Sequence, residues 1–330
     1  MPTYKAKFSA FGSHTPAKIV NNFDLEKMID TTDEWIRTRT GMIERHYCAE
    51  DEAASDLATV AATNAIEASQ VRFKDIDLII TGTVTGDHAF PSTACVVQKK
   101  LGLKGIPAFD VSAGCSGFIY ALNIAKTFVE NGSAENILVI GVDVLTKITN
   151  WADRGTCVLF GDGSGAAVVS RARQSDTSHI IDCLIQSDGS QGELLFQAAG
   201  GSRMPASHET VDKNLHTVYM EGNRIYKQAI RSMFSSTDEL LKRNKISAED
   251  VDWIIPHQAN LRIIEALASK LRVPMSKVIV NIEKYGNTSS ATIPLALDEA
   301  IRSGKIRRGD IILLTAFGAG LTWGSLLARY

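Results

Sequence analysis

Residues 73–80, FKDIDLII, and residues 248–255, AEDVDWII, share one pattern, an acidic turn followed by a short apolar strand. The second copy lies 175 residues after the first, so that Ile79 corresponds to Ile254. The same offset relates two further pairs of segments: residues 121–125 (ALNIA) to 296–300 (ALDEA), and residues 137–141 (ILVIG) to 312–316 (ILLTA). A fixed offset shared by several segments indicates an internal duplication.

Both halves alternate short apolar runs of β type with helical patterns of period about 3.6. Such alternation is typical of layered α/β folds. The polar stretch 171–178 lies between the halves, so we expect an N-terminal half over residues 1–173 and a C-terminal half over residues 174–330. The segment 187–217, rich in Gly, Ser and His, is expected to be an irregular insertion. The alternative is that the two halves share only the strand–helix alternation common to all α/β proteins.

The bulk composition limits the classes of function. The chain has 330 residues, 45% of them apolar and 22% charged, which suits a globular protein with a large core. A net charge of −2 gives no reason to expect nucleic acid or an anionic membrane as a partner. The five cysteines form no C-x-x-C pair, which argues against a disulfide framework or a zinc site and favours a reducing compartment. No signal core and no run approaching about 20 apolar residues occurs, so we expect a cytoplasmic protein.

Cys115 is the candidate nucleophile. It lies in residues 106–122, IPAFDVSAGCSGFIYAL, where the pattern predicts a strand over 108–112, a turn of small residues and then a helix. Unpaired N–H groups and the dipole at a helix N-terminus favour a thiolate, so we expect the pKa of this thiol to be lowered. The flanking glycines, Gly114 and Gly117, leave room for a substrate carbonyl near the backbone. The alternative is that Cys115 is a buried cysteine that acts as a small hydrophobic residue.

His257 and Asn287 are the candidate partners of that cysteine. His257 follows a predicted strand over 252–256, and Asn287 lies between a predicted strand over 278–282 and a helix over 291–301. The ends of strands are where α/β proteins gather their sites. In the duplication Asn287 falls near the position of Cys115, so the two turns are expected to face one another. The alternatives are a histidine that caps a helix and an asparagine in an ordinary turn.

These motifs together resemble the β-ketoacyl-[acyl-carrier-protein] synthase III family of the thiolase-like superfamily, over nearly the whole chain. The matching segments are DEWIRTRTG (33–41), HAFPSTAC (88–95), FDVSAGCSG (109–117), DRGT (153–156), FGDGSGA (160–166), PHQANLR (256–262), YGNTS (285–289) and AFGAG (316–320). The resemblance implies a dimer of thiolase-like subunits, each a duplicated αβαβα five-layered sandwich.

Residue roles follow from the resemblance position by position. It implies that Cys115 is the acylated nucleophile and that His257 and Asn287 complete the triad. The other implied roles are Phe317 beside the nucleophile, Trp35 and Arg154 at the adenine of CoA, Arg39 and Asn260 near the CoA entrance, Phe90 in the neighbouring subunit's acyl pocket, and Arg262 as a contact for the acidic carrier protein. Leu145 and Phe160 are candidate walls of the acyl pocket, while Lys227 and Lys270 are taken as solvated surface charges. Ala319 departs from the family, in which many members have glycine.

The activity that the resemblance implies is a decarboxylating Claisen condensation of an acyl-CoA primer with malonyl-[acyl-carrier-protein], catalysed by an acyltransferase that initiates fatty acid synthesis. The implied partners are acyl carrier protein, acyl-CoA as a substrate and a second copy of the chain, with no cofactor, metal, nucleic acid or membrane. Three rivals stay open. One is a specialised relative of secondary metabolism, and another is a cysteine thioesterase or hydrolase, because hydrolases also use cysteine, histidine and asparagine in this chain order. An inactive acyl or CoA binder is a third.

Overall fold

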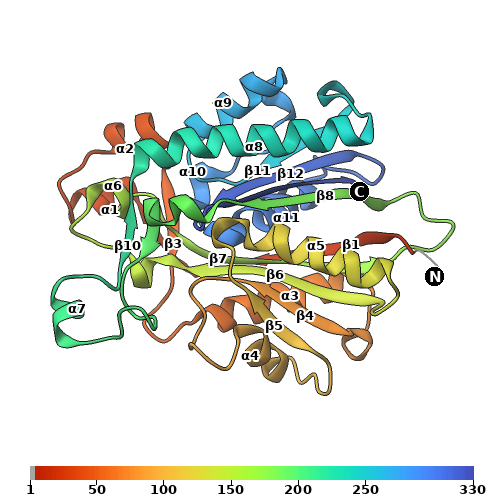
Figure 1. Cartoon of the computed structure of the whole chain (residues 1–330), viewed down its shortest axis with the longest axis horizontal. Helices are drawn as coiled ribbons and strands as arrows, with labels where there is room; N and C mark the ends of the chain where they lie inside the picture. The colour runs from red at the N-terminus through yellow and green to blue at the C-terminus, as the bar shows by residue number, and fades with distance from the viewer. Residues whose placement is uncertain (1–3) are drawn as a thin grey trace.

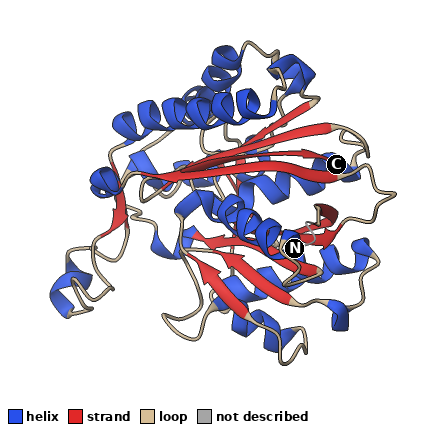
Figure 2. Ribbon diagram, turned by 45° about the vertical axis from the view of Figure 1, so that its right-hand side comes forward, coloured by secondary structure: helices blue, strands red, loops and turns tan. Residues whose placement is uncertain are grey.

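The computed structural model describes residues 4–330 and stacks helices and sheets in five layers, α–β–α–β–α (Figure 1). The middle layer consists of helices α5 (Gly117–Glu130) and α11 (Thr292–Arg302), which run between two β-sheets, as Figure 2 shows by separating helices from strands in colour. This is the duplicated five-layered sandwich that the family resemblance implies.

The first sheet has the strand order β1-β7-β6-β4-β5. Its strands are β1 (Ala6–His14), β7 (Asp162–Arg171), β6 (Asn136–Val144), β4 (Leu78–Gly82) and β5 (Ala108–Val111). Strands β6, β4 and β5 are parallel to one another, while β7 is antiparallel to both β1 and β6.

The second sheet repeats this arrangement in the order β8-β13-β12-β11. Its strands are β8 (His179–Ser187), β13 (Thr322–Arg329), β12 (Ile311–Gly318) and β11 (Trp253–Pro256). Strands β11 and β12 are parallel, and β13 is antiparallel to both of its neighbours, as β7 is in the first sheet. The repeated order and directions confirm the internal duplication.

The outer layers each present one apolar face to a sheet. Helices α3 (Ala54–Ser69) and α4 (Thr93–Lys100) cover the first sheet, and α8 (Gly222–Asn244) and α9 (Leu261–Leu271) cover the second (Figure 1). In α8 the buried residues recur every three or four positions: Ile225, Ala229, Met233, Ser236 and Leu240. That spacing is the stripe expected of a surface helix whose stability comes from packing against the core.

The middle helices are buried on more than one side because they contact both sheets. Phe118, Leu122 and Ala125 of α5 and Leu297 of α11 belong to one apolar cluster that also takes in residues of both sheets. Burying a Phe or Leu side chain stabilises the fold by about 1.5–3 kcal/mol. The helix predicted after Cys115 is confirmed, and this cluster holds the two halves together.

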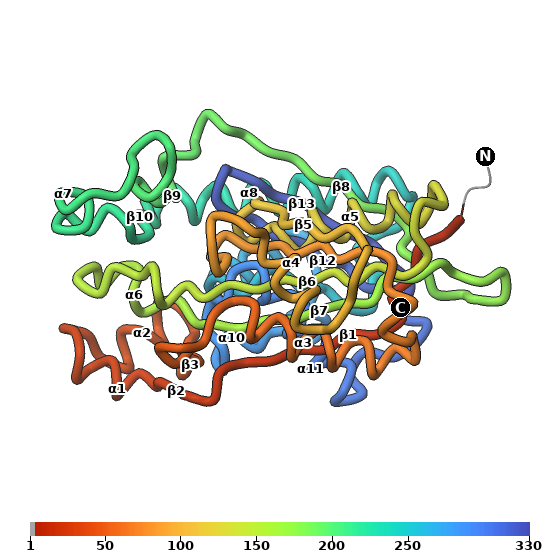
Figure 3. The backbone as a smooth tube through the Cα atoms, turned by 90° about the horizontal axis from the view of Figure 1, so that it is seen from below, coloured from red at the N-terminus to blue at the C-terminus, as the bar shows by residue number. Residues whose placement is uncertain are grey.

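Smaller elements extend one end of the sandwich. A cap is formed by β2 (Lys18–Asn21), β3 (Glu44–Tyr47), α1 (Asn22–Glu26), α2 (Asp33–Thr40), α6 (Arg154–Cys157) and α10 (Ile282–Tyr285). A second extension consists of the strand pair β9 (Leu195–Gln197) and β10 (Val218–Met220) and a long loop between them that contains α7 (His208–Asp212). Figure 3 shows this loop projecting from the body of the molecule. The predicted irregular insertion over 187–217 thus corresponds to an arm with short elements of its own.

The strand predicted over residues 278–282 was wrong. Val278 makes only an isolated bridge to Ile254, and α10 already begins at Ile282. The Gln258 side chain takes the place of a ladder partner, because its Nε2 donates to the carbonyl of Ile279 (3.2 Å) and its Oε1 accepts from the N–H of Asn281 (3.1 Å). A glutamine side chain thus satisfies backbone groups that a neighbouring strand would otherwise pair with.

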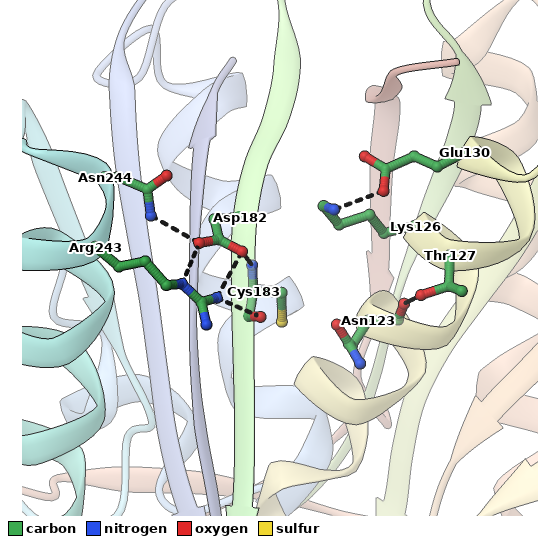
Figure 4. Close-up of polar contacts among 8 residues, drawn as sticks. All are labelled: Asn123, Lys126, Thr127, Glu130, Asp182, Cys183, Arg243 and Asn244. Atoms are coloured by element: carbon green, nitrogen blue, oxygen red, sulfur yellow. Dashed lines mark hydrogen bonds and ion pairs between the residues drawn. The ribbon is translucent and has the colours of Figure 1, made fainter. Parts of the chain in front are cut away.

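Strand β8 lies between helices of two different layers (Figure 4). Asp182 forms a bidentate ion pair with Arg243 of α8, in which both N···O distances are 2.7 Å. It also accepts a hydrogen bond from the side chain of Asn244 (2.8 Å). These donors hold the pKa of Asp182 below its ordinary value despite partial burial. The next residue, Cys183, packs against the central cluster, and burial raises the pKa of its thiol to about 12. Cys183 is therefore a protonated, packed thiol.

Candidate active site

A cavity of about 780 Å³ lies where the two middle helices begin. Its lining includes Cys115, just before α5, and Ser289, just before α11. His257, at the end of β11, and Asn287 line the same cavity. The three residues singled out from the sequence therefore meet in one site, although they come from both halves of the chain.

Cys115 occupies the 3₁₀ turn η2 (Gly114–Ser116) between β5 and α5, close to the predicted strand–turn–helix arrangement. The loop after β12 packs backbone to backbone against this turn. A Cβ atom on Gly318 would lie 2.4 Å from the backbone nitrogen of Cys115, and one on Gly114 would lie 2.6 Å from the backbone nitrogen of Ala319. Gly114 also has a φ of +52°, which disfavours other residues. Glycine is therefore required at both positions for this close approach.

The pKa expected for Cys115 was wrong in direction. Burial raises the pKa of the thiol to about 12, and the carboxylate of Asp143 raises it further, whereas a hydrogen bond from Ser289 acts in the opposite sense. Loss of solvation in the buried site is the largest cause of the shift, and it acts against the thiolate. The thiol is thus protonated at neutral pH in the unliganded protein.

Asn287 is held by the backbone of the first half and by its own turn. Its N–H donates to the carbonyl of Leu159 (2.9 Å), and its carbonyl accepts from the N–H of Gly161 (3.1 Å). Its side-chain Oδ1 accepts from the N–H of Ser289 (2.9 Å). Because a backbone N–H can only donate, the bonded atom is the amide oxygen, and Nδ2 keeps its hydrogens for other partners. Asn287 therefore brings a pair of N–H donors to the cavity.

His257 is 3% exposed, and its ring Nδ1 lies 2.7 Å from Oγ1 of Thr292 at the start of α11. Burial lowers the pKa of His257 to about 3, so the ring is neutral at pH 7. Its backbone N–H donates to the carbonyl of Thr315 on β12 (2.8 Å), which fixes the residue at the end of the sheet.

A buried carboxylate links the two loops that border the site. Asp143, fully buried at the end of β6, accepts from Val84 N–H (2.8 Å) and from the hydroxyls of Thr83 (3.1 Å) and Thr85 (2.9 Å). Its other oxygen accepts from the N–H (3.2 Å) and hydroxyl (2.9 Å) of Ser290. Five donors compensate this buried charge, and together they tie the loop after β4 to the turn that carries Asn287.

Sequence reasoning missed Ser289, Thr292 and Asp143. Ser289 and Thr292 follow Asn287 within the stretch NTSSAT, and the 3₁₀ turn η7 (Ser289–Ala291) brings their hydroxyls to the site. Asp143 was detectable as a charged residue inside the otherwise apolar run ILVIGVDV (137–144). A charge in such a run requires partners, which is itself a signal of a polar site.

Aromatic and basic residues lie at the outer rim. The guanidinium carbons of Arg39 and Arg154 lie 5.0 and 4.9 Å from the ring centroid of Trp35. Trp35 and Arg39 line the cavity, whereas Arg154 reaches it only through Trp35. Asn260 caps α9 through Oδ1 and donates from Nδ2 to the carbonyl of Arg39 (3.0 Å), so it joins α9 to α2.

The remaining predicted residues divide into three positions. Leu145, Phe160 and Phe317, each at most 6% exposed, line the interior of the cavity. Arg262 is exposed at the entrance. Phe90 is 85% exposed and lies outside the cavity of its own chain, so its assignment to a neighbouring subunit's pocket stays a prediction.

Neither a metal-binding cluster nor a membrane-spanning helix is found in residues 4–330. No group of three or more His, Cys, Asp or Glu side chains is arranged there to hold a metal ion. Within the same residues, no helix combines the length and the apolar character needed to span a membrane.

Comparisons with known proteins identify the family of the chain. The family model described as 3-oxoacyl-[acyl-carrier-protein (ACP)] synthase III matches residues 109–189, and the model of its C-terminal part matches residues 241–330. The β-ketoacyl-[acyl-carrier-protein] synthase III of Caldanaerobacter subterraneus is 55% identical, over 97% of this chain and 96% of the relative.

Solved structures give the same result. The 3-oxoacyl-[acyl-carrier-protein] synthase III of Aquifex aeolicus is 48% identical with a TM-score of 0.90, covering 98% of this chain and 100% of that one. The priming β-ketosynthase of the R1128 polyketide pathway is 33% identical with a TM-score of 0.91, covering 99% and 97%. On the strength of these matches over nearly its whole length, the chain belongs to the β-ketoacyl-[acyl-carrier-protein] synthase III family.

Proposed function

We propose that the protein is an acyltransferase that condenses an acyl-CoA primer with malonyl-[acyl-carrier-protein], releasing CO2 and giving a β-ketoacyl-[acyl-carrier-protein]. This reaction would initiate fatty acid synthesis. The observation that carries the proposal is the meeting of Cys115, His257 and Asn287 around one cavity of about 780 Å³. A thiol, an imidazole and a carboxamide supply a nucleophile and hydrogen-bonding groups for a reaction that proceeds through charged oxygens.

In the first half-reaction the sulfur of Cys115 attacks the thioester carbonyl of the acyl-CoA. The new C–S bond holds the acyl group on the protein, the bond to the CoA sulfur breaks, and CoA leaves as the thiol with the proton that Cys115 gave up. Covalent capture divides one difficult step into two easier ones and gives ping-pong kinetics. The backbone near Cys115 and the loop with Ala319 approach each other closely enough to supply N–H groups for the oxyanion.

In the second half-reaction the malonyl thioester loses CO2. The electron pair of the broken C–C bond passes to the thioester oxygen, giving an enolate, and N–H donors around that oxygen lower the barrier. Nδ2 of Asn287 suits this task because Oδ1 is already occupied by the N–H of Ser289. Loss of one such donor costs about 2.7–4 kcal/mol in known cases. The enolate carbon then attacks the acyl group on Cys115, the C–S bond breaks, and the sulfur leaves as a thiolate that takes up a proton from solvent to restore the thiol.

The outer rim suits the carriers of the two substrates. Trp35, with Arg39 and Arg154 beside it, offers an aromatic face and positive charge for the adenine and phosphates of CoA. Arg262, exposed at the entrance, suits the acidic carrier protein. In this scheme acyl-CoA is a substrate, and side chains of the chain itself perform each step. A cytoplasmic location fits these substrates.

We propose that the protein is a homodimer and that each subunit consists of two similar halves. Phe90 is 85% exposed on a loop beside the edge strand β5, whose residues are only half-buried, and a second copy would cover both. Strands β1 and β7 of the first sheet come from residues 1–173, and the second sheet is built from strands beyond residue 173. This sheet membership supports the division of each subunit at that point.

The test is a product assay with radiolabelled acyl-CoA primers of different length and branching, and malonyl-[acyl-carrier-protein] in excess. We expect a labelled β-ketoacyl thioester and CO2. Cys115→Ser should abolish transfer of label to the protein, while the matched variant Cys183→Ser, altered at a packed thiol, should retain it. A free acid as the product would overturn the proposal in favour of a hydrolase. Transfer of label to the Cys115→Ser variant would overturn the assignment of Cys115 as the nucleophile.

A second candidate is a priming synthase of a specialised pathway. The observation that favours it is the TM-score of 0.91 to the priming β-ketosynthase of the R1128 polyketide pathway, at 33% identity. The same assay separates the two when carrier proteins from fatty acid and polyketide systems compete for the enzyme.

A further inference from the structure

The hydroxyl of Thr292 lies beside Nδ1 of the His257 ring, and Thr292 is not among the residues that line the cavity. Thr292 is 2% exposed, and its Oγ1 lies 2.7 Å from Nδ1 of His257. The other ring nitrogen, Nε2, makes no hydrogen bond within residues 4–330, and His257 lines the cavity. Nδ1 is thus the structural nitrogen and Nε2 the one available to substrates.

A neutral imidazole carries one N–H, so the partner of Nδ1 decides whether Nε2 donates or accepts. His257 is neutral near pH 7 because burial lowers its pKa to about 3. If Nδ1 is an acceptor, the N–H lies on Nε2 of a residue that lines the same cavity as Asn287. If Nδ1 is the donor, Nε2 presents only a lone pair and cannot stabilise a negative oxygen.

Two acceptors compete for the single hydroxyl hydrogen of Thr292. Besides Nδ1, the carbonyl oxygen of Ser289 lies 3.0 Å from Oγ1. That carbonyl already accepts the backbone N–H of Thr292 itself. Nδ1 is also the nearer acceptor: its distance of 2.7 Å matches the commonest distance for a hydroxyl donor and lies at the short end of the N–H range of about 2.7–3.2 Å.

We infer that Thr292 is a positioning residue: its hydroxyl donates to Nδ1 of His257 and keeps the neutral ring in the Nε2–H tautomer. The inference rests on the proposed function, in which donors to the malonyl thioester oxygen promote loss of CO2. With Nε2–H fixed, His257 and Nδ2 of Asn287 present two N–H donors to one oxygen. The turn from Asn287 to Thr292 thus supplies one donor, Nδ2 of Asn287, and fixes the tautomer of His257 that provides the other.

The tautomer is measured first, in the free protein. Nitrogen-15 NMR of the imidazole side chains distinguishes Nε2–H from Nδ1–H, and the His257 signals are assigned by their loss in His257→Ala. We expect the Nε2–H pattern at pH 7 in the unmodified protein and in Thr292→Ser, and its loss in Thr292→Val, which keeps the shape of the side chain but has no hydroxyl. An Nδ1–H pattern in the unmodified protein overturns the inference without bearing on the proposed function.

Kinetics then separate positioning from simple support of the fold. We expect Thr292→Val to slow decarboxylation of malonyl-[acyl-carrier-protein] at least tenfold, while the rate of acyl transfer to Cys115 stays within about twofold, and Thr292→Ser to restore decarboxylation. An equal loss of both half-reactions in Thr292→Val, or a Thr292→Ser variant as slow as Thr292→Val, overturns the inference.

A double-mutant cycle provides the last discriminator. If Thr292 acts only through the imidazole, Thr292→Val should change nothing further in a His257→Ala background, because the two losses are then not additive. Full additivity would overturn the inference. Failure of the unmodified protein to decarboxylate the malonyl thioester would instead refute the proposed function, and the NMR result would still stand.

Discussion

The side-chain hydroxyl of Ser289 lies 3.3 Å from the sulfur of Cys115, although 174 positions separate the two residues in the chain. Ser289 adopts a φ of +54°, in the left-handed region that serine rarely occupies. The bond from its N–H to Oδ1 of Asn287 helps to hold this conformation, which costs about 1–2 kcal/mol. A strained residue at the reacting sulfur suggests that its hydroxyl contributes to the reaction.

Ser289→Ala should therefore slow acyl transfer to Cys115 about tenfold or more, because a hydrogen bond to a charged group is worth about 1.5–3 kcal/mol. Ser289→Gly is the matched variant, since it also lacks the hydroxyl but relieves the backbone strain. We expect Gly to unfold at a higher temperature than Ala and to be equally slow in acyl transfer, measured with radiolabelled acyl-CoA. Recovery of the rate in the glycine variant would show that the hydroxyl has no part in the reaction.

The alkylation of Cys115 should depend steeply on pH. Because burial raises the pKa of this thiol to about 12, the thiolate fraction should increase about tenfold for each pH unit between pH 7 and 10. We expect the iodoacetamide rate at Cys115, followed by mass spectrometry, to climb throughout this range with no plateau. A plateau below pH 8 would mean that the helix dipole outweighs desolvation and that the thiolate is already formed in the free protein.

Trp35 and Arg154 should affect CoA binding alone. The guanidinium of Arg154 lies 4.9 Å from the Trp35 ring centroid, whereas an adenine stacked between them needs about 7 Å, two layers of about 3.5 Å. An adenine stacked between the two side chains would therefore require Arg154 to move. We expect Trp35→Ala and Arg154→Ala to raise the KM for acyl-CoA several-fold and to leave the KM for malonyl-[acyl-carrier-protein] unchanged. Equal increases in both KM values would place these residues in the support of the fold instead.

Charge reversal at Arg262 should weaken the carrier-protein substrate. We expect Arg262→Glu to raise the KM for malonyl-[acyl-carrier-protein] about tenfold, with an effect that shrinks as salt is added, because rim charges act mainly on association. Lys270→Glu is the control, since Lys270 is exposed on the same helix but does not line the cavity entrance. A similar change in both variants would indicate a loss of general surface attraction and no local contact.

Stability should fall on the acid side because of His257. Its pKa is lowered from 6.5 to about 3 in the folded state, so the unfolded chain binds a proton that the folded chain does not. As pH falls below about 6.5, this residue should therefore destabilise the fold by up to about 1.4 kcal/mol per pH unit. Urea unfolding of the unmodified protein and of His257→Ala from pH 7 to 4.5 measures the difference. If the unfolding free energies of the two proteins change with pH in the same way, burial does not lower the pKa of His257.

The sequence predicted the architecture because the duplication preserves residue spacing. The offset that links Ile79 to Ile254 also links the starts of β6 and β12, so two matching sheets followed from it. The motifs placed Cys115, His257 and Asn287 in one cavity for the same reason. The predictions that were wrong concerned properties that depend on the tertiary surroundings of a residue, which a local sequence pattern does not describe. Desolvation reversed the expected pKa of Cys115, and the side chain of Gln258 replaced the ladder of the strand predicted at 278–282.

The backbone of Asn287 is paired with Leu159 and Gly161, which belong to the opposite half of the molecule from α11. Catalytic activity should consequently require that the contact between the two halves is intact. An intermediate in which either sheet persists alone would keep much of its circular dichroism and yet lose all catalytic competence, so that enzymatic inactivation would precede loss of secondary structure as denaturant is raised.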